Sequence, residues 1–445
     1  MADQSNLQPD YGAKDLGKYQ DLGRGPATSY FRRLAAQAGI PPDAGTFARL
    51  AAFTSNPANW GKWAEHVLRY IGNGRHPFQS YGDASGVYPL DDKSLLAVAG
   101  DWGTGTDEAQ HVITEMKNHN PDYTVHLGDV YYVGDLPEVE ENCFGAPTNG
   151  ITGVKWQSGT KGSFALNGNH EMYACGTAYF QRFLPSLGLV NQAGQPGGQK
   201  ASFFCLENKY WKIIGLDTGY NSVGVRTVLS FLSRLKAVQW PRKTTWFKPS
   251  CKLPDDLMAW LKKILPTTPD SSNAGSAGIT PAIVLLSHHE YYSSFDDWYP
   301  IPATQLRSHL SPQRPVLWFW GHEHRFALYD RFGTKDGIQA FGRCIGHGGM
   351  PVDRHAVPDI TDCNCILYDN RRYPTSENID VGYNGFITLA FDGPSLQVNY
   401  YDLFSTLLLT ECWTSDGKGQ LQGPKFRSVN PDLKQNDARY IKEHS

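Results

Sequence analysis

Short apolar runs recur through the middle of the chain, and most of them are followed at once by a side chain that can bind a metal. Six runs rich in β-branched and aromatic residues occupy 94–100, 123–128, 162–168, 210–216, 282–287 and 315–321. Runs of this length and composition are typical of buried strands. Between some of them, the segments 107–120 and 255–265 carry apolar residues at helical spacing. Strands alternating with helices predict an α/β layer architecture.

The sequence predicts three regions of different character. Residues 1–90 form an N-terminal extension with a helical preface at about 28–72, which we expect to pack without carrying chemistry. Residues 91–410 form the main domain, and 411–445 a C-terminal tail. Two stretches late in the main domain, 385–393 and 396–402, have strand character with no helix between them. They predict that the sheet system ends in antiparallel pairs.

Composition excludes several classes of protein. The 445 residues are 40% hydrophobic, enough for one large core, and the formal net charge is only −3. No broad nucleic-acid surface is therefore expected. There is no run of 18 apolar residues and no secretory signal layout, so we expect a cytoplasmic protein without a membrane span. Eight scattered cysteines without a CxxC pair are expected to be mostly reduced, with Cys363 and Cys365 as the pair to watch.

Five of the predicted strands end in oxygen or imidazole donors. These residues are Asp101, Asp129, Asn169 with His170, His288 with His289, and His322 with His324. In open α/β sheets ligands bind beyond the carboxyl ends of the strands, so the donors are predicted to converge. One such residue alone is more often a hydrogen-bonding group than a ligand. Five strand ends with suitable donors favour a metal site.

The donor set has the composition of a two-metal centre. It offers carboxylates, an amide and imidazoles, and no thiolate. A carboxylate between two ions that lie about 3.5–4 Å apart can bridge them, and such centres serve hydrolysis at phosphorus. The two cations would acidify water and neutralise phosphoryl oxygens.

Five short motifs carry a specific resemblance. GDWG (100–103), GDVYY (128–132), GNHE (168–171), SHHE (287–290) and GHEH (321–324) follow one another in the chain. Together they resemble the signature of the calcineurin-like metallophosphoesterase superfamily. The resemblance covers about 90–400 and implies two mixed β-sheets packed as a sandwich and flanked by helices.

Two positions resemble the purple acid phosphatase-like branch of that superfamily. Gly103 stands where many members have a histidine ligand, and Tyr132 lies three residues beyond Asp129. The resemblance implies Fe³⁺ at metal 1 and Fe²⁺, Zn²⁺ or Mn²⁺ at metal 2. It assigns metal 1 to Asp101, Asp129, Tyr132 and His324, and metal 2 to Asp129, Asn169, His288 and His322. Tyr132 packing beside the site is the alternative. Tyr131 is expected to face away into the core, because an extended segment alternates its side chains.

The roles of the remaining candidates stay more open. By resemblance His170 is the general acid, and Glu171 either orients its imidazole or is a surface carboxylate. In SHHE the resemblance favours His288 as the ligand, with His289 directed to substrate or placed behind the ligands. Substrate contacts are expected from His289, His347 and Tyr173, whereas Asp217 is expected to be structural.

Three functions fit these patterns. The first is an acid phosphatase-like enzyme that hydrolyses a small phosphate monoester. The second is a phosphodiesterase of the same superfamily, acting on cyclic nucleotides or phospholipid headgroups. The third is a non-catalytic binding protein, which the intact donor set disfavours.

Overall fold

The structure is a computed structural model, and it describes most of the chain beyond residue 73. The described residues are 74–83, 85–131, 133–147, 152–223, 249–265, 278–311, 313–352, 354, 363–373 and 381–445. The predicted helical preface lies outside them, and so does Tyr132.

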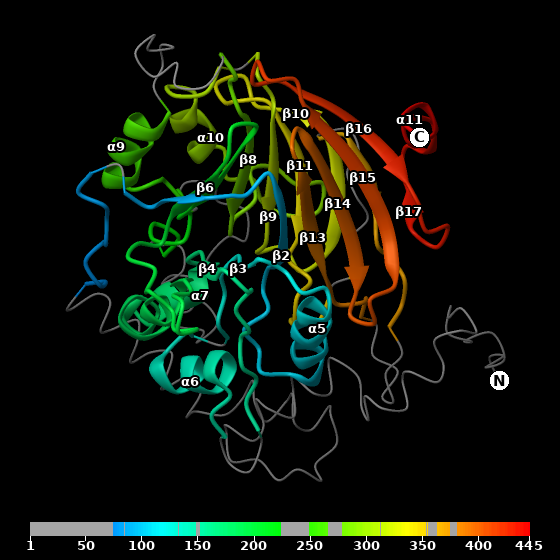
Figure 1. The fold of residues 1–445 in the computed structure, drawn as a ribbon. Helices are drawn as coiled ribbons and strands as arrows, with labels where there is room; N and C mark the ends of the chain where they lie inside the picture. Colours follow the sequence, from blue (N-terminus) through cyan, green and yellow to red (C-terminus); the bar gives the residue numbers. More distant parts are fainter. Residues whose placement is uncertain are drawn as a thin grey trace, which may run out of the picture.

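Two mixed sheets face each other within these residues, with helices on their outer faces (Figure 1). The first sheet has the order β1 (Val87–Pro89), β6 (Phe204–Glu207), β7 (Trp211–Leu216), β8 (Ala282–Ser287), β9 (Val316–Trp320), β11 (Ala340–Ile345), β10 (Phe326–Phe332), β12 (Cys365–Tyr368) and β17 (Lys434–Gln435). The second has the order β16 (Leu421–Arg427), β15 (Leu407–Ser415), β14 (Ser395–Asp402), β13 (Gly385–Asp392), β2 (Lys93–Ala99), β3 (Tyr123–His126), β4 (Gly162–Ala165) and β5 (Gly188–Leu189). The predicted fold class is confirmed.

Strands that are connected through helices are predicted to be parallel, and the late strands without helices between them antiparallel, and the structure has both arrangements. β2, β3 and β4 are parallel neighbours in the second sheet, and β7, β8 and β9 are parallel neighbours in the first. β13 pairs antiparallel with both β2 and β14. Parallel strands of one sheet end at the same edge, so the residues that follow β2, β3 and β4 come close together.

Side-chain alternation along β2 builds two cores. Leu96 and Val98 belong to the apolar cluster between the sheets, whereas Ala97 and Ala99 pack in the cluster beneath α5 (Asp107–Asn118). Strands covered on both faces read as continuous apolar runs, which explains the sequence pattern. The hydroxyl of Thr106 caps α5 by accepting a hydrogen bond from the amide of Ala109 at 3.2 Å.

The other helices cover the sheets or connect them. They are α6 (Leu136–Phe144), α7 (Asn169–Tyr173), the π-helix η1 (Tyr179–Phe183), the 3₁₀ helix η2 (Leu184–Ser186), α9 (Asp255–Ile264), α10 (Ile301–Leu306) and α11 (Ala438–Glu443). None of the helices in the described part of the chain has the length and apolar character needed to cross a membrane.

The C-terminal segment is part of the sandwich. The predicted boundary at residue 410 falls within β15, and the segment continues through β16 at the edge of the second sheet. β17 then pairs with β12 in the first sheet. Ile441 of α11 is buried in the cluster between the sheets. The segment after residue 410 therefore joins the two sheets.

A buried ion pair also links the sheets. Arg343 of β11 donates from its guanidinium to the carboxylate of Glu411 on β15, with Nε 3.0 Å from Oε2. The hydroxyl of Tyr400 donates to the same oxygen at 2.7 Å. The expectation that most of the eight cysteines are reduced stays a prediction.

Candidate metal centre

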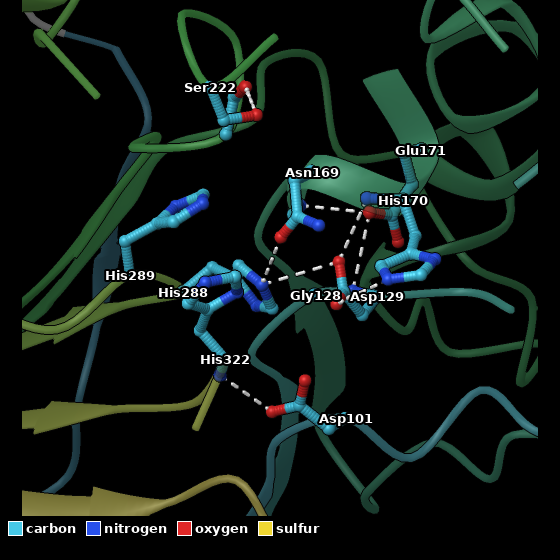
Figure 2. Close-up of polar contacts among 12 residues, drawn as sticks. Asp101, Gly128, Asp129, Asn169, His170, Glu171, Ser222, His288, His289 and His322 are labelled. Atoms are coloured by element: carbon cyan, nitrogen blue, oxygen red, sulfur yellow. Dashed lines mark hydrogen bonds and ion pairs between the residues drawn. The ribbon is translucent and has the colours of Figure 1, made fainter. Parts of the chain in front are cut away.

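The donor residues meet where strands of both sheets end (Figure 2). Asp101 follows β2 and Asp129 follows β3, while His288 and His322 follow β8 and β9 of the other sheet. Backbone hydrogen bonds hold these ends together. The amide of Asp101 donates to the carbonyl of Gly128 at 3.2 Å, and the amide of Gly321 donates to the carbonyl of His288 at 2.9 Å.

Three of the donors have left-handed backbone conformations. The φ angles are 57° at Asp101, 73° at Asp129 and 64° at His322. Residues other than glycine rarely adopt such values, and each costs on the order of 1–3 kcal/mol. The surrounding hydrogen bonds maintain these conformations, which turn each side chain out of its strand direction.

One group of donors gathers around the hydroxyl of Tyr131. This oxygen lies 2.8 Å from Asp101 Oδ1, 3.0 Å from Asp129 Oδ2 and 3.0 Å from His324 Nε2. Tyr131 is buried as expected, but the expectation that it faces away from the site is wrong. The left-handed turn at Asp129 interrupts the two-residue alternation on which that expectation depended. The role assigned to Tyr132 stays a prediction.

A second group gathers around His288. Its Nε2 lies 3.1 Å from Asn169 Oδ1 and 3.2 Å from Asp129 Oδ1. Its Nδ1 lies 3.0 Å from the carbonyl oxygen of Leu127, a hydrogen bond that only a protonated Nδ1 can donate. In the neutral ring, Nε2 therefore keeps its lone pair for a ligand. The ring of His322 has its centroid 5.2 Å from that of His288.

His289 also lies at the centre. The ligand atoms of His288, His289 and His322 all lie within 4.8 Å of one another, and the same holds for Asp101, Asp129 and His288. The amide and Nδ1 of His289 contact the hydroxyl of Thr218 at 3.0 and 3.1 Å. The structure thus brings both histidines of SHHE together and leaves their separate roles as predictions.

Burial and mutual charge set the protonation of these groups. Burial raises the pKa of Asp101 to about 7. Burial opposes ionisation of Asp129 too, but the imidazole of His288 and then that of His170 hold its pKa well below the ordinary value. Asp129 in turn raises the pKa of His288 to about 9 against the effect of burial. The ionised carboxylate of Asp129 is thus paired with the protonated imidazole of His288, whose positive charge a bound metal ion would replace.

The two histidines of GHEH are neutral. Burial lowers the pKa of His322 to about 3 and that of His324 to about 4. Neutral imidazole is the form that binds a metal. The side chain of His324 is still 27% exposed, so the centre is open on that side.

His170 and Glu171 lie at the start of α7. The imidazole of His170 is 14% exposed, and its Nε2 lies 3.7 Å from Asp129 Oδ2. Its ring centroid is 4.3 Å from that of Tyr131. Glu171 does not orient this imidazole, contrary to one of the two expectations, and it is not a surface residue either. Its Oε2 accepts hydrogen bonds from the backbone amides of Asp129 and Gly168, because the side chain turns back to cap its helix.

The remaining predicted residues differ in how close they come to the centre. Tyr173 lies beside it, since the amide nitrogen of Asn169 donates to its hydroxyl at 2.9 Å. His347 is buried against the ring of Phe326, with a centroid distance of 5.7 Å. Both of its ring nitrogens have no hydrogen-bond partner within the described residues, and its contact with substrate stays a prediction. Asp217 accepts from the amide of Tyr220 at 2.7 Å, as a structural residue would.

The donor spacing suits metal ions. Nitrogen and oxygen ligands sit about 2.0–2.2 Å from a transition ion, which puts neighbouring ligand atoms roughly 3 Å apart. The contacts of His288 Nε2 with Asn169 and Asp129, at 3.1 and 3.2 Å, have this spacing.

Three groups at the centre were not predicted from the sequence: Tyr131, Thr218 and the carbonyl of Leu127. Of these, only Tyr131 carried a signal, its place in GDVYY.

Comparison with known proteins gives one family match and several remote structural similarities. Residues 95–326, more than half of the chain, match the family described as calcineurin-like phosphoesterase. No curated protein matches the chain. A purple acid phosphatase from yellow lupin (Lupinus luteus) seeds is similar at 14% identity and a TM-score of 0.41, over 82% of this chain and 56% of that one. PhoD is similar at 11% identity and a TM-score of 0.42, over 82% and 77%. GAP50, the anchor in the inner membrane complex of Plasmodium, is similar at 13% identity and a TM-score of 0.38, over 79% and 93%.

Proposed function

Because the chain belongs to the calcineurin-like phosphoesterase family, we propose that it is an acid phosphatase-like enzyme that hydrolyses a small phosphate monoester at a dinuclear metal centre. Metal-dependent hydrolysis of phosphate esters is what the family implies. One observation carries the centre. Asp129 Oδ1 lies 3.2 Å from His288 Nε2 and Oδ2 lies 3.0 Å from the hydroxyl of Tyr131, so its two oxygens face two separate donor groups. This is the arrangement of a bridging carboxylate.

The proposed ions are Fe³⁺ at metal 1 and Fe²⁺, Zn²⁺ or Mn²⁺ at metal 2. Asp101, Asp129 and His324 would hold the first, with Asp129, Asn169, His288 and His322 at the second. A phenolate is a hard anionic oxygen, suited to Fe³⁺. The resemblance assigns that phenol to Tyr132, whereas the contacts of the Tyr131 hydroxyl with three donors of metal 1 favour Tyr131.

The side chains at the rim supply the rest of the chemistry. When bound, the two ions would neutralise phosphoryl oxygens and supply a water acidic enough to attack phosphorus. His170, His322 and His324 are all partly exposed, and the side chains of His170 and His324 are 14% and 27% accessible. We assign protonation of the leaving oxygen to His170, whose ring packs against those of Tyr131 and Tyr173 at centroid distances of 4.3 and 4.9 Å.

Steady-state rates on two model esters test the proposed reaction. The protein is stripped with a chelator, reloaded with iron and zinc, and assayed with nitrophenyl phosphate and bis(nitrophenyl) phosphate. We expect the larger kcat/KM for the monoester. Preference for the diester would replace the proposal by a phosphodiesterase, and two bound ions without hydrolysis of either ester would indicate a binding protein.

The visible spectrum tests the iron and identifies the phenol. A phenolate bound to Fe³⁺ gives a charge-transfer band, so the iron-loaded protein is expected to be coloured. Tyr131→Phe and Tyr132→Phe form a matched pair that differs by one position in the same turn. The variant that loses the band marks the ligand. A colourless protein with full activity and two Zn²⁺ or Mn²⁺ would contradict the iron assignment.

A further inference from the structure

The carboxylate of Glu171 is fully buried and bonded to backbone alone. Its Oε2 accepts hydrogen bonds from the amide of Asp129 at 3.2 Å and from the amide of Gly168 at 2.9 Å. Its Oε1 has no hydrogen-bond partner among the described residues. Burying a carboxylate costs free energy unless hydrogen bonds or a charged partner compensate it. Here the hydrogen bonds come from Asp129 itself and from Gly168, which directly precedes Asn169.

The first residues of α7 hold Asp129 by both its backbone and its side chain. Glu171 accepts a hydrogen bond from its backbone amide, and the backbone amide of His170 donates to its Oδ1 at 3.0 Å. Main chain and side chain of Asp129 are therefore fixed by two consecutive residues. Figure 2 shows Asp129 directly beside His170 and Glu171.

The packing leaves little room for Asp129 to move. A Cβ on Gly168 would meet Asp129 Oδ1 at 2.1 Å. A Cβ on Gly134, whose φ is 64°, would meet the Cα of Glu171 at 2.6 Å. Both glycines allow backbone contacts that no other residue permits. The left-handed φ of 73° at Asp129 needs such support, because its local energy disfavours it.

We propose that Glu171 is a positioning residue that fixes the bridging carboxylate of Asp129 for both metal ions at once. The inference rests on the proposed dinuclear centre. Since Asp129 contacts Tyr131 in the first donor group and His288 in the second, displacing it weakens both ion sites together. Loss of a donor that belongs to one group weakens mainly that group.

Glu138 offers a matched control in the same loop. Its Oε2 also accepts two backbone hydrogen bonds, from Val133 at 2.7 Å and from Gly134 at 2.8 Å, and it is buried as well. It does not contact the amide of Asp129. A general loss of loop order would therefore appear in variants of both glutamates, whereas positioning of Asp129 depends on Glu171 alone.

The experiment measures Zn²⁺ binding to the full-length, chelator-stripped protein. Dissociation constants of both sites are determined by equilibrium dialysis and metal analysis for wild type, Glu171→Ala, Glu171→Gln, Glu138→Ala and Asn169→Ala. We expect Glu171→Ala to weaken both sites by about 10–100-fold, the usual loss for residues behind the ligands. Glu171→Gln keeps an oxygen for both amides and is expected to restore both sites. Asn169→Ala is expected to weaken one site.

Several outcomes would overturn the inference. These are wild-type affinities in Glu171→Ala, loss of one site only, or an equal loss of both sites in Glu138→Ala. If Glu171→Ala does not fold, as judged by circular dichroism, Glu171→Asp replaces it, because its shorter side chain keeps the charge but retracts the oxygens. A wild-type protein that binds fewer than two ions overturns the centre and the inference together. A wild type that binds two ions without hydrolysing esters contradicts the proposed function alone.

Discussion

Two buried charged clusters in this molecule differ in how their charge is balanced. Between the sheets, the guanidinium of Arg343 meets the carboxylate of Glu411, with Nε 3.1 and 3.0 Å from the two oxygens. The hydroxyl of Tyr400 donates to the same carboxylate, and the carbonyls of Tyr329 and Gly342 accept from the guanidinium. At the candidate centre, two buried carboxylates face imidazoles and a phenol, and burial raises the pKa of Asp101 to about 7.

The difference separates a structural cluster from a binding site. The ion pair is complete within the chain, so each buried charge has a partner in fixed geometry. The candidate centre instead brings together carboxylate oxygens and imidazole nitrogens, and bound cations would offset the repulsion between these ligand atoms. Strained φ angles occur at Asp101, Asp129 and His322 in the centre, whereas Arg343 and Glu411 lie in regular strands. Backbone strain and surplus donors together mark the functional cluster.

Asp129→Asn would break the comparison most strongly. Removing the shared carboxylate should abolish binding of two ions and lower kcat by about 10⁴-fold or more, as for a member of a catalytic unit. Metal analysis and ester hydrolysis measure both effects. Wild type prepared in parallel is the control. A variant that keeps both ions and its activity would show that Asp129 is not the bridge.

Glu411→Ala tests the opposite cluster. It leaves Arg343 as an unpaired buried charge, which should reduce the free energy of unfolding by about 3–5 kcal/mol. Urea denaturation measures the loss, and zinc content per folded molecule should stay unchanged. A double variant with Arg343→Met and Glu411→Leu removes both charges and should recover most of the stability. An equal loss in the double variant would contradict this account.

His347 sharpens the comparison, because its buried imidazole belongs to neither cluster. Burial lowers its pKa to about 4, against an opposing contribution from Asp369 and with a further lowering by Arg371. The unfolded chain binds a proton near pH 6.5 and the folded one near 4, so stability is lost as pH falls through this window. The loss amounts to roughly 3 kcal/mol. Urea unfolding of the chelator-treated protein at pH 7 and pH 5 should show a flatter dependence for His347→Gln. The same pH dependence of the unfolding free energy in wild type and His347→Gln would show that His347 does not cause the loss of stability.

Thr218→Val should have the smallest effect. It removes the hydroxyl that contacts Nδ1 of His289 at 3.1 Å, at a cost of about 1 kcal/mol, or roughly fivefold in kcat/KM. Steady-state kinetics with the preferred ester measure it, and Thr218→Ser, which keeps the hydroxyl, is the control. Equal rates in both variants would show that this contact does not orient His289.

The sequence predicted which residues meet but not how their side chains point. Apolar runs and the donors after them defined β2, β3, β4, β8 and β9 and their shared edge, because burial on both faces and strand ends are local properties. The side-chain direction of Tyr131 was predicted wrongly because Asp129, two residues before it, has a left-handed backbone conformation. Glu171 was misassigned because a helix cap competes with the expected contact to His170. β15 was not predicted as a strand, since its pairing depends on distant segments.

The position of β2 has a consequence for assembly. β2 delivers Asp101, yet on one side it pairs with β13, which lies near the opposite end of the chain. During synthesis, β2 emerges long before that neighbour exists, and such distant pairings form slowly. A nascent chain can thus present the strands before Asp101 and Asp129 while the sheet beside them is still unfinished. Ion capture is therefore expected to follow closure of this sheet, which would make it one of the last steps of maturation.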